Sequence, residues 1–130
     1  MPNLNSTLEK LEKSKWEDPK SSSHVISECH RLRKVPLSQF TTEDLRLMIG
    51  QGLSLEYLVP LALDKLTDNP FSEGDFYPGD LLKAVLGVKW EFWESNKELF
   101  STLNDIMSSV EGMLETAQNE LIPSWQSYFR

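Results

Sequence analysis

The chain has 130 residues, a length that suits one compact domain with one buried core, so we expect residues 1–130 to form a single domain. Apolar residues make up 39% and charged residues 25%, a balance that argues against a disordered or fibrous protein. No apolar run approaches the length of a membrane span, the N-terminus lacks a secretory signal pattern, and Cys29 is the single cysteine. We therefore expect a protein of the reducing cytoplasm, away from the membrane.

The net charge of −7 is unevenly distributed along the chain. Residues 1–50 contain eight Lys or Arg and seven Asp or Glu, a net +1, whereas residues 51–130 contain five and thirteen, a net −8. An acidic surface repels nucleic acid and attracts basic proteins, whose encounter it accelerates. The charge therefore favours a basic protein partner over direct binding of nucleic acid, although solubility alone also explains a moderate negative charge.

Helical spacing of apolar residues begins near the N-terminus. Residues 5–7 offer a capping side chain, and Leu4, Leu8 and Leu11 share one helical face. This first helix is predicted to end before Pro19, because the residue before a proline is driven out of the helical region.

A loop over residues 19–23 (PKSSS) separates the first helix from a short second one. Residues 34–36 end the second helix, and residues 36–40 are expected to be extended. The predicted buried face of the second helix comprises Val25, Ile26, Cys29 and Leu32.

Capping signals predict the third and fourth helices. Asp44 follows Thr41 at the spacing of a helix start in which side chains and backbone N–H groups cap each other. Gly50 and Gly52 mark the end of the third helix, because glycine readily takes the left-handed conformation of a helix exit. Ser54 is predicted to cap the fourth helix.

Pro60 falls inside the fourth helix, where it removes a backbone donor and predicts either a kink or a late helix start. A structured loop, residues 69–79, follows. Asp80 is predicted to cap a short helix that starts at Leu81, and Phe76 is expected to anchor the loop on the core.

A long helix is predicted from Trp90, with Pro123 ending or bending it. Its apolar positions alternate by four and three, which is typical of a helix-packing seam: Leu99, Leu103, Ile106, Val110, Met113 and Ala117. Packing inside a bundle is the favoured use of this seam, and pairing with a separate coiled-coil helix is the alternative. The C-terminus is expected to dock through Trp125, Tyr128 and Phe129. The pattern as a whole predicts an all-α bundle of about six helices with one long C-terminal helix.

Signatures of catalysis and of metal binding are weak. His24 and His30 lie about a third of a turn apart around a helix, so with Cys29 they do not form a zinc site. The acidic residues of the loop lack the spacing of an EF-hand calcium site. We expect no catalytic residue, no metal and no cofactor.

Two groups of residues are candidates for contact with a protein partner. On one stripe of the predicted long helix lie Glu91, Glu94, Glu98 and Asp105. In the loop, Glu73, Asp75 and Tyr77 are expected to face a partner. A solvated face is the ordinary alternative for such a series. Among the crowded aromatic residues Trp90, Phe92 and Trp93, one is expected near the surface as an interface anchor.

Residues 45–93 carry a family resemblance, most clearly in the strings LRLMIGQGLSLEYLVPLAL and GDFYPGDLLKAVL. They resemble the immunity proteins of bacterial contact-dependent growth inhibition (CDI) systems. The resemblance implies a protein without enzymatic activity that binds the C-terminal toxin domain delivered by a sister cell, in a one-to-one complex. Many such toxins are nucleases with a basic phosphate site, so the resemblance also implies an acidic inhibitor that takes the place of nucleic acid.

Two other classes of function fit parts of the pattern. A helical adaptor or regulator that self-associates through the long helix is the main alternative. A small enzyme with carboxylates in a cleft would require convergent acidic residues with perturbed pKa values, which the spacing does not demand.

Overall fold

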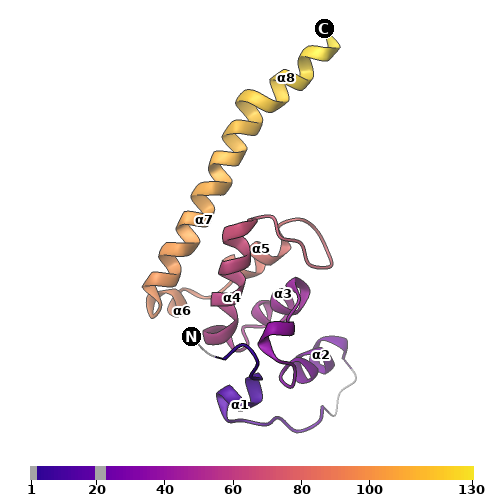
Figure 1. The fold of residues 1–130 in the computed structure, drawn as a ribbon, viewed down its shortest axis with the longest axis vertical. Helices are drawn as coiled ribbons and strands as arrows, with labels where there is room; N and C mark the ends of the chain where they lie inside the picture. The colour runs from indigo at the N-terminus through magenta and orange to yellow at the C-terminus, as the bar shows by residue number, and fades with distance from the viewer. Residues whose placement is uncertain (1–2, 20–22) are drawn as a thin grey trace.

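The computed structural model describes residues 3–19 and 23–130 and is built from helices (Figure 1). Within those residues no strand is present, although Glu73 and Pro78 form an isolated antiparallel bridge. The predicted all-α fold is confirmed, and residues 20–22 of the predicted loop lie outside the described residues. In chain order the elements are α1 (Leu8–Glu12), α2 (His24–Leu32), η1 (Leu37–Gln39), α3 (Thr42–Gly50), α4 (Leu55–Asp68), α5 (Asp80–Leu86), α6 (Trp90–Glu94), α7 (Lys97–Thr116), η2 (Ala117–Leu121), α8 (Ile122–Gln126) and η3 (Ser127–Phe129).

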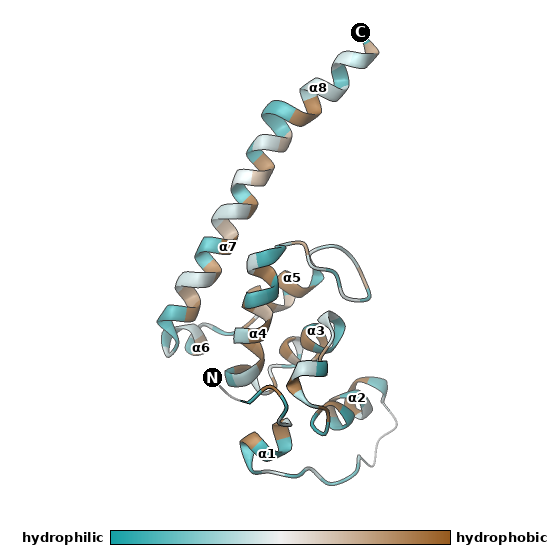
Figure 2. Cartoon of the chain, in the orientation of Figure 1, coloured by the Kyte–Doolittle hydropathy of each residue, from teal (hydrophilic) through white to brown (hydrophobic). Residues whose placement is uncertain are grey.

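The hydrophobic core surrounds α4, which packs against α3, α5 and α7. Leu58, Val59 and Leu66 of this helix are completely buried, and Figure 2 shows the hydrophobic bands along α4 in the middle of the body. Each such side chain contributes roughly 1.5–3 kcal/mol by leaving water. The core therefore fixes α5, which follows the loop over residues 69–79, and α3, whose Glu43 contacts that loop.

The start of α3 is capped as the sequence predicts. The Thr41 hydroxyl accepts a hydrogen bond from the Asp44 backbone N–H at 3.1 Å, and the Asp44 carboxylate accepts one from the Thr41 N–H at 2.9 Å. The predicted cap at Ser54 is wrong, because this residue has a φ of 53° and its side chain makes no cap bond. Its carbonyl oxygen instead accepts the first helical bonds of α4, from Tyr57 and Leu58.

Two further local predictions need correction. The helix α4 begins at Leu55 and continues through Pro60, so the late start that the proline suggested is wrong. Residues 36–40 are not extended: Leu37–Gln39 form the 3-10 helix η1, because the Gln39 and Phe40 N–H groups bond back to carbonyl groups three residues earlier. This turn buries the Leu37 side chain.

The predicted helix from Trp90 is two helices. The first, α6, ends at Glu94, and α7 starts at Lys97. At the break, the Asn96 side-chain amide donates to the Phe92 carbonyl at 2.7 Å and so bonds a group left open at the end of α6. The Asn96 side chain thus replaces the backbone N–H group that would bond this carbonyl if the helix continued.

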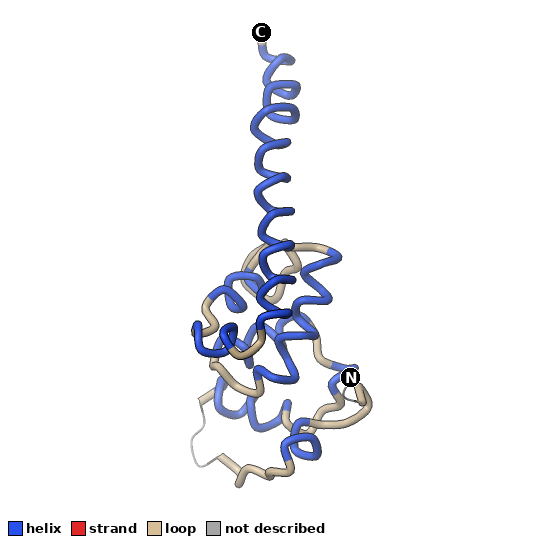
Figure 3. Tube along the Cα trace, turned by 90° about the vertical axis from the view of Figure 1, so that its left-hand side faces the viewer, coloured by secondary structure: helices blue, strands red, loops and turns tan. Residues whose placement is uncertain are grey.

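The last third of α7 and the elements after it extend beyond the body as one rod (Figures 1 and 3). We call residues 111–130 the arm. The predicted docking of its aromatic residues is wrong: Trp125, Tyr128 and Phe129 are 59%, 84% and 72% exposed. Pro123 does not end the helix either, because the π-helical turn η2 precedes it and α8 carries the chain on to Gln126.

A buried cation holds the N-terminal segment against α2. Arg33 is 2% exposed, pairs with the Glu12 carboxylate and donates to the Ser14 carbonyl at 2.8 Å. Its guanidinium also lies 4.4 Å from the centroid of the Trp16 ring. Sequence reasoning missed this residue, which ties residues 12–16 to the end of α2.

Among the described residues, no helix is both long and apolar enough to cross a membrane. The same residues hold no group of three or more His, Cys, Asp or Glu side chains placed to bind a metal ion. His30 lies instead in edge-on contact with the Trp16 ring, at 5.0 Å between centroids.

Candidate partner-binding surface

The loop over residues 69–79, which we call the aromatic loop, is held by a single buried carboxylate. Asp80 is 4% exposed, and its side chain accepts hydrogen bonds from the backbone N–H groups of Gly74 at 2.7 Å, Phe76 at 3.0 Å and Tyr77 at 3.4 Å. The predicted role of Asp80 as the cap of α5 is wrong, because Asp80 is the first residue of that helix and Gly79 precedes it with a φ of 95°. The Asp80 carboxylate therefore orders the loop that precedes α5 in the chain.

Ionisation of Asp80 is favoured by these bonds. Burial alone would raise the pKa of its carboxyl group, but the N–H groups of Gly74, Phe76 and Tyr77, together with the positive charge of Arg46, outweigh burial and lower the pKa. The loop is therefore organised around a carboxylate that stays charged at neutral pH.

A second carboxylate connects the aromatic loop to α3. Glu43 accepts a hydrogen bond from the Asp75 backbone N–H at 3.0 Å and forms a two-bond pair with Arg46, at 2.6 Å for each bond. The Arg46 hydrogen bond is the largest influence on Glu43; it lowers the pKa of this carboxyl group, against the opposing effect of burial and with help from the Asp75 N–H. The spacing of Glu43 and Arg46 on one helical face was the available sequence signal, and our sequence reasoning did not use it.

Gly74 is required by this arrangement of carboxylates. A Cβ atom at this position would lie 2.6 Å from Oε1 of Glu43 and 3.1 and 3.3 Å from the two carboxylate oxygens of Asp80. Such distances are too short for any side chain to fit without moving one of the two carboxylates. The presence of glycine at position 74, the first residue of the string GDFYPGD, thus has a steric explanation.

The loop backbone presents two aromatic side chains to solvent. Phe76 is 66% exposed and Tyr77 is 50% exposed, so the predicted anchoring of Phe76 on the core is wrong. Hydrogen bonds to Asp80 and Glu43 fix the backbone, and no aromatic anchor is needed. The Arg46 guanidinium lies 4.5 Å from the centroid of the Phe76 ring, a cation–π contact that orients the exposed ring.

Phe76 and Tyr77 form one wall of an open hollow of about 390 Å³ between the aromatic loop, α3 and α5. The cations Arg46 and Lys83 and the small residues Gly50 and Ala84 line the rest, with Asp80 below. Aromatic and arginine side chains held around a concavity are typical of the contact points that dominate protein interfaces.

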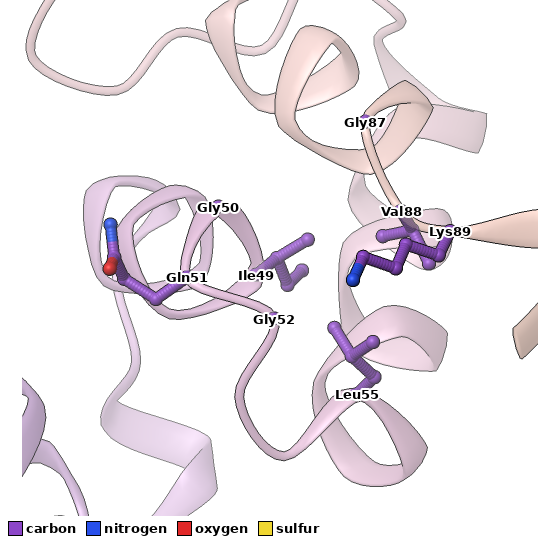
Figure 4. Close-up of a pocket in the computed structure, with 8 residues that line it drawn as sticks. All are labelled: Ile49, Gly50, Gln51, Gly52, Leu55, Gly87, Val88 and Lys89. Atoms are coloured by element: carbon purple, nitrogen blue, oxygen red, sulfur yellow. The ribbon is translucent and has the colours of Figure 1, made fainter.

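A second hollow, of about 330 Å³, lies between the end of α3 and the connection from α5 to α6 (Figure 4). Its lining residues are Ile49, Gly50, Gln51, Gly52, Leu55, Gly87, Val88 and Lys89. Lys89 is the only ionisable side chain in this lining, so the hollow does not carry the carboxylate pair or the nucleophile that a small enzyme would need.

The four acidic residues predicted on one stripe are exposed, but they belong to two helices. Glu91 and Glu94 lie on α6, whereas Glu98 and Asp105 lie on α7, after the break at residues 95–96. The prediction of one stripe on one helix is therefore wrong.

The acidic residues of the loop, Glu73 and Asp75, are also exposed, and Figure 1 shows that α6 and the loop lie on different sides of α4. The structure thus separates the predicted contact residues into two groups. Tyr77 belongs to the loop group.

The crowded aromatic residues at the start of α6 divide as expected. Trp93 is buried at 3% exposure, whereas Trp90 is 56% exposed and makes an edge-on contact with Phe100 at 5.2 Å between ring centroids. Trp90 adds an exposed aromatic side chain to the α6 group of acidic residues.

A model of the family of CDI immunity proteins matches residues 10–103. This match includes the aromatic loop, its carboxylates and α6, and it ends within α7, before the arm. No curated protein and no solved structure matches the chain.

Proposed function

Because the chain belongs to the CDI immunity proteins, we propose that it binds the C-terminal toxin domain of a CDI effector and neutralises it. It would thereby protect the cell that produces it and that cell's siblings. Neutralisation in this proposal is stoichiometric binding, one immunity protein to one toxin domain, without a chemical step catalysed by this chain. The bacterial cytoplasm, where a delivered toxin acts, is the proposed place of binding.

The structural observation that supports this proposal is the order of the aromatic loop. Three backbone N–H groups bonded to Asp80 hold Phe76 and Tyr77 outward before any partner arrives. A loop that is already ordered loses little conformational entropy on binding, so more of the contact free energy appears as affinity. Exposed aromatic side chains beside an arginine then supply the anchors.

We propose a nuclease as the toxin, because a nuclease is basic around its phosphate site and this chain is acidic. The acidic contact residues would be Glu73 and Asp75 of the loop, and Glu91, Glu94, Glu98 and Asp105 of α6 and α7. Charges of this kind chiefly accelerate encounter and select the partner. Rapid encounter matters because the inhibitor must reach the toxin before damage occurs.

The first test is calorimetric titration of the full chain with the purified toxin domain encoded immediately upstream, at low and at high salt. We expect a Kd in the nanomolar range or below, and weaker binding at high salt because ions screen the acidic residues. The charge-reversed Glu91→Lys/Glu94→Lys variant is expected to associate more slowly. Glu17→Lys/Asp18→Lys, in the N-terminal segment, serves as a control that makes the same charge change at exposed residues away from the proposed contacts.

Survival of bacteria that express the toxin together with each variant gives the functional readout. Absence of binding by the wild-type chain would contradict the proposed function. Tight binding that is insensitive to salt would keep the function and assign the contacts to Phe76, Tyr77 and Trp90 in place of the acidic residues.

One observation favours the alternative of a self-associating helical adaptor: the arm exposes apolar residues on a long helix. Sedimentation equilibrium of the isolated chain tests it directly. The immunity function requires no self-association, whereas the adaptor requires a dimer or larger assembly.

A further inference from the structure

The apolar face by which α7 packs against α4 continues along the arm, where α4 no longer covers it. In the body, Leu103 and Ile106 of α7 are buried at 4% and 3% exposure, where α7 packs against α4. Farther along the same helical face the exposed fractions rise to 46% for Met113, 62% for Leu121 and 59% for Trp125. We call this face the arm seam. It begins at the half-buried Val110, at the edge of the body, and continues through Met113, the half-buried Ala117, Leu121, Trp125 and Phe129.

Side chains at these positions share a face because each follows the one before by about one helical turn. The wider π-helical turn η2 lies between Ala117 and Leu121, and it keeps the two halves of the seam in line. Trp125 and Phe129 contact each other edge-on at 5.2 Å between ring centroids. An exposed apolar stripe of this length marks a surface that another protein covers.

We propose that the arm seam binds an apolar groove in a basic protein surface, and that this surface belongs to the toxin domain. The inference rests on the proposed function and adds a second contact to it. Its support is the charge of the segment: between Lys97 and Arg130 the sequence contains no Lys, Arg or His. The charged residues in that interval are Glu98, Asp105, Glu111, Glu115 and Glu120.

This charge argues against a second copy of the chain as the occupant. In paired helices the residues beside the apolar seam choose the partner through opposite charges. Two arms of this protein would place carboxylates near carboxylates, with Arg130 at the tip as the one cation in residues 111–130, which opposes association. A basic groove would instead be attracted by Glu111, Glu115 and Glu120 of the arm.

The base of the arm seam also joins the aromatic loop. Phe71, at the start of the loop and 45% exposed, lines an apolar hollow of about 360 Å³ together with Val110, Met113, Leu114 and Ala117 of the helix. One partner can therefore contact the arm seam and the loop without a gap. The family match ends at residue 103, so the arm lies outside the matched region and would add contacts specific to this chain's own toxin.

The test compares three full-length proteins in calorimetric titrations with the toxin domain. The seam variant carries Leu121→Asp and Trp125→Asp. The control carries Asn119→Asp and Ser127→Asp, which add the same charge to the opposite face of the same helix. We expect the seam variant to raise Kd by about thirtyfold or more, as for loss of interface anchor residues, and the control to leave Kd within about threefold of wild type.

Both variants change exposed residues, so their unfolding midpoints are expected to match that of the wild type. If circular dichroism shows that the aspartates unwind the arm, the Leu121→Ala/Trp125→Ala variant, which retains helix propensity, replaces the seam variant. Amide hydrogen exchange supplies an independent readout: exchange in the arm is expected to slow when the toxin domain binds.

An unchanged Kd for the seam variant beside tight binding by the wild type would overturn this inference and leave the proposed function intact. Absence of binding by the wild type would defeat the proposed function as well. A wild-type dimer that the seam variant converts to a monomer would assign the seam to a second copy and overturn the inference in a different way.

Discussion

The Asp80 carboxylate accepts a hydrogen bond from the Gly74 backbone N–H at 2.7 Å, and this contact closes the aromatic loop upon the first residue of the next helix. Two further N–H groups bond to the same carboxylate. The order of the proposed binding loop therefore depends chiefly on the buried charge of Asp80, with Glu43 as a second contact to the loop, and these carboxylates lead to the first three predictions.

Replacing Asp80 with asparagine is expected to lower the free energy of unfolding by roughly 2–3 kcal/mol, because the side chain keeps its size and loses the charge that the loop N–H groups contact. Urea titration followed by circular dichroism measures the change. The exposed Asp75 provides a matched control, since Asp75→Asn changes a carboxylate in the same loop whose side chain is in solvent. Equal stability of the two variants would contradict the role of Asp80.

Stability is expected to fall in acid. The folded-state pKa values of Asp80 and Glu43 are both lowered, so their contributions are complete above the pKa of the unfolded chain and are lost as pH falls through the lowered folded values. Unfolding midpoints measured from pH 7 downward past the unfolded-chain values of about 4 follow the onset of this loss. The Asp80→Asn variant should show a shallower decline, and parallel curves for variant and wild type would assign the acid loss to other groups.

Gly74→Ala is expected to destabilise the chain and weaken binding of the toxin domain, because the added methyl group displaces the Glu43 carboxylate or that of Asp80. Gly50→Ala is the matched control: a Cβ there meets nothing within 4 Å, and alanine in place of glycine at a helix end gains up to about 1 kcal/mol. Opposite signs of the two stability changes in thermal melts would support the steric account. A Gly74→Ala protein as stable as wild type would refute it.

Arg33→Ala is expected to lower the free energy of unfolding by about 3 kcal/mol, because it removes a buried cation and leaves Glu12 and the Ser14 carbonyl without their partner. Limited proteolysis should then cut the N-terminal segment first. Arg31→Ala is the control: this exposed side chain pairs with Glu28 on its own helix and with Asp44 of α3 at 3.8 Å, surface contacts each worth less than about 1 kcal/mol. Similar losses for both arginines would contradict the difference in burial.

Periodicity predicted the helices well, because the spacing of apolar residues reports which face of a helix is buried. It also identified the cap at Thr41, whose partner lies in the same helical turn. The role of Asp80 was missed because an aspartate at a helix start has the same local sequence whether it bonds forward to the helix or backward to a loop. Only the fold shows that Gly74 lies within reach.

The errors in the C-terminal part have a different origin. Apolar spacing along α7 indicates a surface that avoids water, and it does not say whether that surface meets the same chain or another one. The docking of the C-terminus predicted for Trp125 and Phe129 is therefore wrong, because both side chains are exposed. The break after Glu94 was missed because residues 95–96 contain neither proline nor glycine, and the Asn96 side chain that bonds the Phe92 carbonyl there is no strong breaker in the sequence.

The π-helical turn between Ala117 and Leu121 sets the rotation of everything beyond it. A π turn holds about one residue more than an α turn, so the same residues wound as an ordinary α turn would rotate the tip by about 100° around the helix axis. Trp125 and Phe129 would then leave the line of Val110 without any change in their chemistry. In this arm, a substitution that removes the π turn is therefore a route to a different partner.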